Sequence, residues 1–299
     1  MLHFFSFIIT TASLILFTPV HAQNGIIVLQ TDFGLKDGAV SAMKGVAMQV
    51  DKKLQVYDLT HEIPAYNIWE AAFRLQQVAQ YWPKGTVFVS VVDPGVGSVR
   101  KPVVLQTKNG YFFISPDNGT LTLIAGEMGI QAVRQIDEKI NRLPGSESSY
   151  TFHGRDIFAY TAARLASGKI SFEQVGKLLP PKVALLSFQK PIIENNIIKG
   201  TITVLDTQYG NVWSNIDASL LKKMGIKLYD TIQVNIYKGD SLLYSEKMPF
   251  VNTFAQVAER NPLCYLNSML QFSVALNMGN FAGQYKIGSG PDWRIEINK

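Results

Sequence analysis

The pattern of hydrophobic and polar positions in the first half of the chain predicts strands and helices that alternate along the sequence. The stretches 26–30, 55–59 and 86–92 read as strands bounded by turn residues. Between them, 39–50 and 67–82 carry apolar residues at helical spacing. This alternation favours a doubly wound sheet, in which ligands bind at loops that follow the carboxyl ends of the strands.

A hairpin and a later helix complete this first half. The runs 103–107 and 111–115 flank Lys-Asn-Gly, and Asn-Gly supplies the positive φ angles of a tight turn. The sheet is therefore expected to be mixed, although mostly parallel. A further helical pattern covers 156–166.

A second domain is predicted after the Leu179-Pro180-Pro181 break, where the polar stretch 189–196 indicates a linker. We expect an N-terminal α/β domain over 23–192 and a mostly β domain over 197–299. The strand patterns of the second domain lie at 198–205, 231–237 and 241–244.

The first 22 residues predict export. An apolar run from Phe4 to Val20 ends in Val-His-Ala, the small-residue pattern that precedes a signal peptidase site. We expect a signal peptide over 1–22, cleavage after Ala22, and a periplasmic or secreted protein. Only His3 precedes the run, so an uncleaved anchor is the alternative. No later segment approaches the ~20 apolar residues of a membrane-spanning helix, so no stable membrane insertion is expected after cleavage.

Composition narrows the possible partners. The net charge of +5 comes from 28 basic and 23 acidic residues that are scattered, so no nucleic-acid partner is expected. The single cysteine, Cys264, forms no internal disulfide. After cleavage only His61 and His153 remain of the histidines, which argues against a histidine-rich metal site. We expect no metal and no cofactor.

Four polar clusters lie where predicted strands end, and each has a structural alternative. Asp32 could cap a helix or accept ribose hydroxyls, and an Asp93–Arg100 pair could be a surface ion pair. Asn118 suits a turn, and an isolated His153 suits a structural imidazole. The clusters are Asp32 with Asp37, Asp93 with Arg100, Asp117 with Asn118, and His153 with Arg155 and Asp156.

Three of these residues together suit the activation of water. If Asp93, Arg100 and His153 converge, a cation lowers the pKa of a bound water and an imidazole accepts or orients its proton. The carboxylate would fix that arrangement without a metal. The sequence contains no dinucleotide-binding or Walker glycine motif and no serine nucleophile elbow.

Seven motifs, in order along the chain, resemble those of the S-adenosyl-L-methionine (SAM) hydrolases, also called SAM hydroxide adenosyltransferases, which are related to fluorinase and chlorinase. They are Thr-Asp-Phe-Gly-x-x-Asp at 31–37, Met-Lys-Gly-Val at 43–46, Asp-Leu-Thr-His-Glu-Ile at 58–63, Gly-Thr-Val-Phe-Val-Ser-Val-Val-Asp-Pro-Gly-Val-Gly at 85–97, Pro-Asp-Asn-Gly at 116–119, Thr-Phe-His-Gly-Arg-Asp at 151–156 and Asp-Thr-Gln-Tyr-Gly-Asn at 206–211.

The resemblance implies hydrolysis of SAM to adenosine and L-methionine, with water or hydroxide attacking the ribose C5′. The family's catalytic triad maps onto Asp93, Arg100 and His153. SAM is the substrate, so no cofactor is implied. The family's fold is an α/β domain followed by a small β-barrel, assembled as a homotrimer with sites between subunits.

The resemblance also implies substrate contacts in both domains. In the first, Asp32 would accept the ribose hydroxyls, Asp37 would approach the methionine ammonium, and Tyr66 would line the pocket. The residues carried over in the second are Asp206 for the methionine portion, Tyr209 packing on the substrate, Asn211 at the adenine, and Ser268 at the methionine carboxylate.

Departures from the family pattern leave alternatives open. Asp93 and His153-Gly154 replace a tyrosine and a halide-contacting serine of the fluorinase-like members, which favours hydrolysis over halogenation. The segment Met269–Ser273 lacks a glycine and a glutamate that the family more often shows, and position 209 is Tyr rather than the commoner Phe. An exported adenosine- or SAM-binding protein without turnover is therefore the alternative function, and a SAM-dependent halogenase a more distant one.

Overall fold

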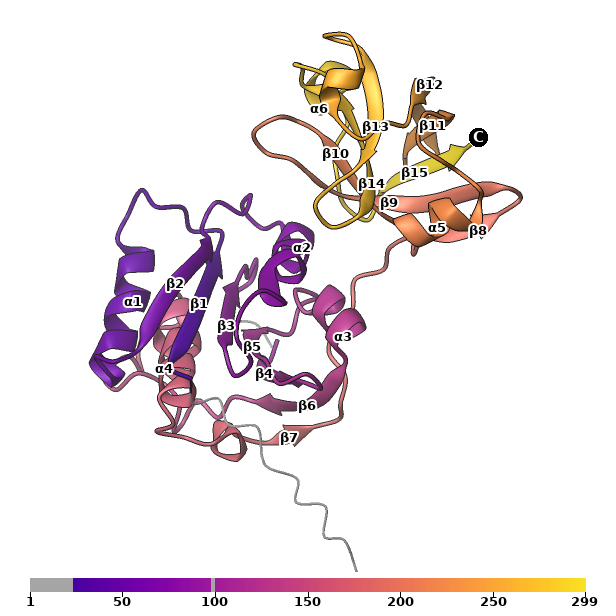
Figure 1. Cartoon of the computed structure of the whole chain (residues 1–299). Coiled ribbons are helices and arrows are strands. Elements are labelled where there is room, and N and C mark those ends of the chain that lie inside the picture. The colour runs from indigo at the N-terminus through magenta and orange to yellow at the C-terminus, as the bar shows by residue number, and fades with distance from the viewer. Residues whose placement is uncertain (1–23, 98–99) are drawn as a thin grey trace, which may run out of the picture.

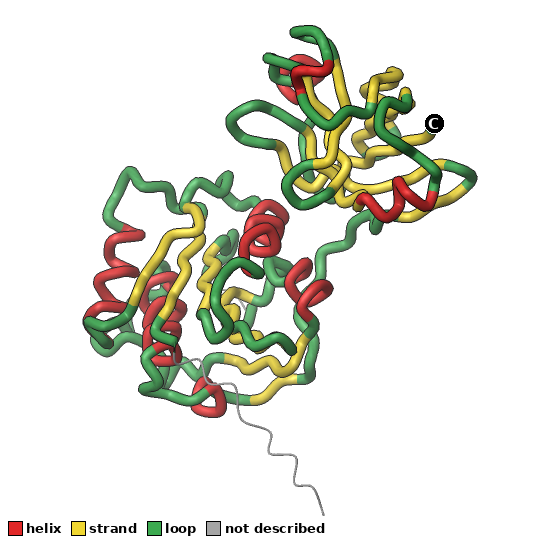
Figure 2. Tube along the Cα trace, viewed as in Figure 1, coloured by secondary structure: helices red, strands yellow, loops and turns green. Residues whose placement is uncertain are grey.

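The computed structural model describes residues 24–97 and 100–299, so the expected signal peptide at 1–22 lies outside the described residues. The described chain forms two domains, a layered α/β domain followed by a β domain (Figure 1). Strands and loops make up most of the second domain (Figure 2). In the described part of the chain, no helix combines the length and apolar character needed to cross a membrane.

The first domain is built on a mixed sheet in the order β2-β1-β3-β5-β4-β6-β7. The neighbours from β2 to β5 in this order run parallel, and the remaining pairs are antiparallel. The strands are β1 (Ile26–Thr31), β2 (Gln55–Thr60), β3 (Val87–Val91), β4 (Pro102–Thr107), β5 (Phe112–Pro116), β6 (Ile130–Gln135) and β7 (Leu178–Leu179). The predicted mixed α/β sheet is confirmed, including the hairpin of β4 and β5.

Helices cover both faces of this sheet. On one face, α1 (Ala39–Val50) packs beside α4 (Tyr160–Ala166), and Met43 and Ala163 join one core cluster with the strands. On the other face, α2 (Ile68–Ala79) packs beside α3 (Thr122–Met128). The apolar faces predicted at 39–50 and 67–82 are therefore the faces that cover the sheet.

The topological switch point of the sheet, where the strand order changes direction, lies between β1 and β3. These neighbouring parallel strands place Thr31 opposite Val91. Because β2 and β3 lie on opposite sides of β1, the loops after β1 and β3 diverge and leave a crevice at their carboxyl ends. Asp32 and Asp93 follow these two strands at that edge.

Two elements differ from the sequence prediction. The helix predicted over 156–166 begins earlier, as a π-helix (Gly154–Ala159) that continues into α4. The predicted linker over 189–196 contains β8 (Ile192–Glu194), which pairs with β9 (Ile197–Leu205) of the second sheet. Asn195 and Asn196 turn this hairpin with positive φ angles, which asparagine tolerates.

The second domain is a barrel-like antiparallel sheet in the order β12-β11-β15-β9-β10-β14-β13. A bridge between Phe250 and Cys264 brings the two end strands together around one apolar core. Short helices α5 (Ala218–Lys223) and α6 (Phe281–Tyr285) flank it. Its further strands are β10 (Val212–Asp217), β11 (Thr231–Lys238), β12 (Ser241–Pro249), β13 (Pro262–Leu266), β14 (Gln271–Leu276) and β15 (Trp293–Asn298).

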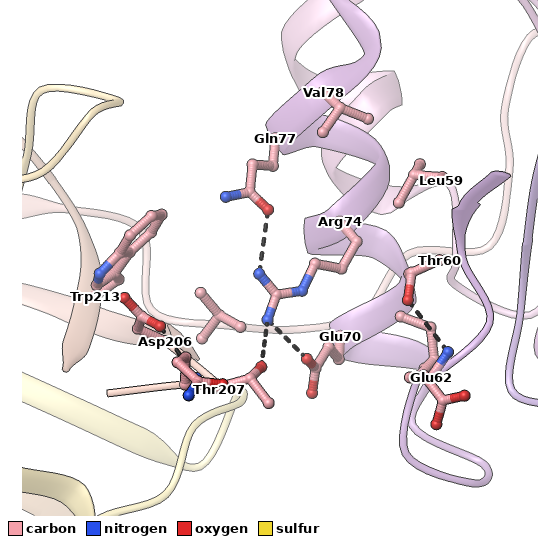
Figure 3. A pocket seen from close by; sticks show the side chains of 13 residues that line it. Leu59, Thr60, Glu62, Glu70, Arg74, Gln77, Val78, Asp206, Thr207 and Trp213 are labelled. Carbon is pink, nitrogen blue, oxygen red and sulfur yellow. Dashed lines mark hydrogen bonds and ion pairs between the residues drawn. The ribbon is translucent and has the colours of Figure 1, made fainter. Parts of the chain in front are cut away.

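Helix α2 makes the main contact between the domains. The indole of Trp69 donates a hydrogen bond to the Thr203 carbonyl at 2.7 Å and packs edge-on against Phe188. Arg74 reaches from the same helix to Thr207, between its partners Glu70 and Gln77 (Figure 3). A cavity of about 530 Å³ lies beside this contact.

Candidate functional site

The loop after β3 holds a close carboxylate–guanidinium pair. Asp93 Oδ1 lies 2.6 Å from Arg100 Nη2, and their side chains are 11% and 25% exposed. Gly95 has a φ of 126°, and a Cβ there would lie 2.5 Å from Arg100 Nη2. A glycine is therefore needed for the guanidinium to fold back over the turn toward Asp93.

His153 shares a cavity with this pair. Asp93, Arg100 and His153 all line a hollow of about 180 Å³, which is large enough to hold water. His153 precedes the π-helix, and its buried Nε2 has no hydrogen-bond partner among the described residues. The structure therefore brings together the three side chains that the sequence marked as a potential catalytic group.

The environment of Asp93 shifts the pKa of its carboxyl. Burial raises the pKa of the Asp93 carboxyl above its usual value and the Asp32 carboxylate adds to this, while Arg100 and His153 act in the opposite direction. Burial has the largest effect. Two carboxylates from neighbouring strand ends and two basic groups thus influence one another in this crevice.

Three further residues with polar side chains line the same cavity, and the sequence analysis does not predict them: Glu138, Arg142 and Tyr150. Arg142 forms an ion pair with Glu138 and donates to the Ser149 carbonyl at 3.1 Å, so it holds the backbone that leads to Tyr150. The four-residue spacing of Glu138 and Arg142 is the one sequence feature that could have indicated the pair.

Asp32 does not cap the helix that follows it. Its Oδ2 accepts a hydrogen bond of 2.9 Å from the backbone N–H of Tyr66, whose φ of 69° is left-handed and whose side chain is largely exposed. Asp37 instead accepts from the N–H of Ala39, the first residue of α1. The structure therefore joins Asp32 to Tyr66 and gives Asp37 a backbone contact just before α1, whose N-cap residue is Gly38.

The Pro-Asp-Asn-Gly motif after β5 makes structural contacts. Asp117 Oδ1 accepts from the N–H of Ala184 at 2.7 Å. The Asn118 amide donates to the Val92 carbonyl at 2.8 Å, directly before Asp93. The turn interpretation therefore suits both side chains, and Asn118 also braces the end of β3.

Candidate substrate residues of the second domain line a separate cavity. Asp206, Tyr209 and Asn211 face a hollow of about 680 Å³ together with Phe254 and Tyr265. Asp206 Oδ1 accepts from the N–H of Gln208, which shapes this loop. The carbonyl oxygen of the buried Asn211 side chain has no hydrogen-bond partner among the described residues, and its amide nitrogen donates to Asp206 Oδ2 at 3.4 Å.

Ser268 lies apart from these residues. It is exposed in the turn between β13 and β14 and does not line the cavity that contains Asn211. The Asn267 side chain shapes the turn by accepting from the N–H groups of Met269 and Gln271. Met269 packs against the apolar cluster at the domain contact.

Within one chain the two candidate half-sites are distinct. The cavity that contains Asp93 and the cavity that contains Asn211 share no lining residue. Among residues 24–97 and 100–299, no group of three or more His, Cys, Asp or Glu side chains is placed to hold a metal ion.

Relatives with curated names and a solved structure are similar along most of the chain. (R)-S-adenosyl-L-methionine hydrolases from Methanocaldococcus jannaschii and Salinispora tropica are each 34% identical, covering 81% and 89% of this chain and 85% and 95% of their own. A fluorinase from Actinoplanes is 28% identical over 89% of this chain and 96% of its own. A crystal structure of an uncharacterized conserved protein from Thermotoga maritima superposes with a TM-score of 0.82 at 33% identity, covering 91% of this chain and all of that one.

Family models match both domains. Residues 27–176 match the SAM hydroxide adenosyltransferase N-terminal domain, and residues 200–294 match the C-terminal domain of the same family. With its mixed α/β sheet and its barrel-like second domain, the chain belongs to the SAM hydroxide adenosyltransferase family.

Proposed function

We propose that the protein hydrolyses SAM to adenosine and L-methionine at the cavity lined by Asp93, Arg100 and His153. The observation that carries the proposal is that a carboxylate, a guanidinium and an imidazole line one small cavity that can hold water. Relatives named as SAM hydrolases that match most of the chain support the same reaction.

In the proposed mechanism a water oxygen attacks the ribose C5′ and the C5′–S bond breaks. The sulfonium sulfur keeps the electron pair of that bond and leaves as the neutral thioether of methionine. Because this leaving group is already cationic, it needs no general acid, and catalysis consists of placing an oxygen nucleophile in line with C5′.

Each of the three side chains has a separate role in activating the water. Arg100 stabilises hydroxide character on the oxygen, and the free Nε2 of His153 accepts the released proton. Asp93 holds Arg100 through their 2.6 Å contact. The reaction needs no metal in this scheme.

Hydrolysis suits this cavity better than halogenation. A halide beside the Asp93 carboxylate would meet a like charge in a partly desolvated site, which is unfavourable. Some relatives are named fluorinases, so a halogenase is the natural comparison. A test with chloride and SAM, followed for a 5′-halo product, distinguishes the two reactions.

The remaining substrate contacts are proposed to come from both domains. Asp32 would bind the ribose hydroxyls, Tyr66 would cover the nucleoside, and Asp37 would approach the methionine ammonium. From the second domain, Asn211 would meet the adenine and Tyr209 would pack on it. Asp206 and Ser268 would then hold the methionine portion.

We propose a homotrimer in which each site lies between two subunits. The separation of the Asp93 and Asn211 cavities within one chain supports this arrangement, because neither cavity is lined by residues of both half-sites. The N-terminal segment is proposed to direct export to the periplasm or outside the cell. Mass spectrometry of the protein from each cell fraction would show whether cleavage follows Ala22.

Incubation of the purified protein with SAM, followed by chromatography, tests the reaction directly. We expect equimolar adenosine and methionine, and a loss of at least about 100-fold in kcat for Asp93→Ala. Asp240→Ala, at an exposed barrel turn, is the matched control and should keep full activity. Unchanged turnover in Asp93→Ala would contradict the proposed role of the triad.

A binding protein without turnover is the second candidate. The position of Ser268 outside the Asn211 cavity favours it, since the methionine end of the site then lacks one expected contact. Calorimetry with adenosine and SAM distinguishes the two functions: binding without product formation supports the second candidate, and measured turnover excludes it.

A further inference from the structure

The Asp-Leu-Thr-His motif at the end of β2 contains a buried histidine that the proposed mechanism does not use. His61 is 3% exposed, and both of its ring nitrogens have partners. Its Nε2 lies 3.0 Å from Asp58 Oδ1, and its Nδ1 lies 2.9 Å from Thr31 Oγ1. Lys44 in turn contacts the other oxygen of Asp58 at 2.6 Å.

Both ring nitrogens of His61 have fixed partners. The Asp58 carboxylate can only accept, so His61 Nε2 donates to it, and Nδ1 forms a hydrogen bond with the Thr31 hydroxyl, which can donate or accept. Although burial raises the pKa of Asp58, Lys44 and His61 together hold it below its usual value, so the carboxylate remains ionised. The ring is thus held at both nitrogens in one orientation.

This arrangement holds the chain on both sides of Asp32. On one side, the His61 ring binds the Thr31 hydroxyl, which also accepts from the N–H of Phe33. On the other side, the His61 carbonyl accepts from the N–H of Gly34 at 2.8 Å. Residues 31 and 34 are therefore tied to a single residue, with Asp32 between them.

The same loop contacts the segment that carries His153. The ring of Phe33 packs edge-on against Phe152 at 6.0 Å between centroids. A Cβ at Gly154 would lie 3.1 Å from the Phe33 ring, so the two segments approach closely. A shift in the loop after β1 would therefore displace Phe152 and Gly154, the two neighbours of His153 in the chain.

We propose that His61 is a positioning residue that sets the Asp32 carboxylate for the ribose hydroxyls of the substrate. This inference rests on the proposed function, because it takes Asp32 to be the ribose contact. It gives the hydrogen-bonded series Lys44–Asp58–His61–Thr31, which runs from the surface to the buried Thr31, a specific role. The Thr31 contact at Nδ1 orients the ligand-binding loop, and the Asp58 contact at Nε2 fixes the ring.

Two substitutions separate the contacts of the ring. His61→Asn places an amide near the position of Nδ1 and can still accept from Thr31, whereas His61→Gln extends toward Asp58 and loses the Thr31 contact. Thr31→Val removes the hydroxyl that contacts His61 Nδ1, so it tests the same hydrogen bond if His61→Gln does not fold. Thermal melting of each variant reports its folding.

The measurement is the affinity of each folded variant for adenosine and for 2′,3′-dideoxyadenosine, which lacks the ribose hydroxyls. For His61→Gln and Thr31→Val we expect the Kd of adenosine to rise about tenfold, as for loss of one charge-assisted hydrogen bond. The Kd of the dideoxy ligand should not change. His61→Asn should bind adenosine within about twofold of the unaltered protein.

Equal losses for both ligands would overturn the proposal, because a general packing role for His61 does not distinguish them. It would also fail if the unaltered protein bound both ligands equally, since Asp32 would then not contact the ribose. Neither result depends on turnover. SAM hydrolysis by the unaltered protein, assayed separately, decides the proposed function.

Discussion

At the scale of single residues, the ionised form of the partly buried Asp93 lowers the stability of the folded protein. Burial raises its pKa, so the folded protein binds a proton at this group more tightly than the unfolded chain does. The contribution of Asp93 to stability therefore falls as the pH rises from the unfolded value of about 3.9 through the raised folded value. At neutral pH the ionised carboxylate opposes folding although Arg100 contacts it.

Asp93→Asn is accordingly expected to melt at a higher temperature than the unaltered protein at pH 7 while losing SAM turnover. The difference in melting temperature should shrink as the pH falls to about 4 and below, because Asp93 becomes protonated in both states only below its unfolded pKa of about 3.9. Thermal melting from about pH 3 to pH 8 measures this.

Asp58 provides a control of opposite sign. Lys44 and His61 keep its folded pKa low despite burial, so its ionised form contributes stability above the unfolded pKa. Asp58→Asn should therefore melt at a lower temperature at pH 7. A lower melting temperature for Asp93→Asn as well would mean that Arg100 outweighs the burial of Asp93.

Part of the candidate site could be predicted from residue types alone. The complementary chemistry of Asp93, Arg100 and His153 predicts that they act together, and the structure places them around one cavity. The roles of Asp32 and Asp37 at the helix start were not predictable, since either carboxylate has the right chemistry for a cap. Only the backbone path shows that Asp37 meets the N–H of Ala39.

At the scale of elements, the strands and helices with a strong hydrophobic period are the ones that the sequence predicts correctly. Strands and helices from β1 to β5 follow runs long enough to show their period, and their bounds differ from expectation by only a few residues. The π-helix (Gly154–Ala159) could not be distinguished, because six residues are too few to separate its period from that of an α-helix. Strand β8 is short, and polar neighbours hide its two isoleucines.

Helix α2 connects the domains through a testable hydrogen bond. Trp69→Phe keeps an aromatic ring in the contact but removes the donor to the Thr203 carbonyl, which leaves a buried acceptor unpaired. We expect a loss of about 1–3 kcal/mol in stability, seen by calorimetry as an earlier transition. Trp82→Phe is the matched control, because Trp82 lies on the first domain and packs against Tyr57 and Phe88.

At the scale of the whole molecule, the two candidate half-sites lie in separate cavities of each chain. Sequence patterns located both halves but could not predict how they are divided, since that depends on how the domains pack against each other through α2. The cavity with Asp93 and the cavity with Asn211 share no lining residue. The proposed assembly would complete each site from two chains.

Mixing two inactive variants tests this division. Asp93→Asn damages the first half-site and Asn211→Ala the second, so each alone should lack activity. In a randomly mixed oligomer about a quarter of the sites should combine two undamaged halves, and activity should return. Co-expression with two affinity tags isolates the mixed species. A mixture no more active than its components would place each site within one chain.

The left-handed backbone of Tyr66 has a practical consequence for engineering. A bulky residue with a φ of 69° carries a conformational strain of about 1 kcal/mol that glycine would not have. A screen that selected only for resistance to heat would therefore favour glycine at this position. It would also delete the exposed ring next to Asp32, so directed evolution of this protein has to score thermal tolerance and ligand affinity together.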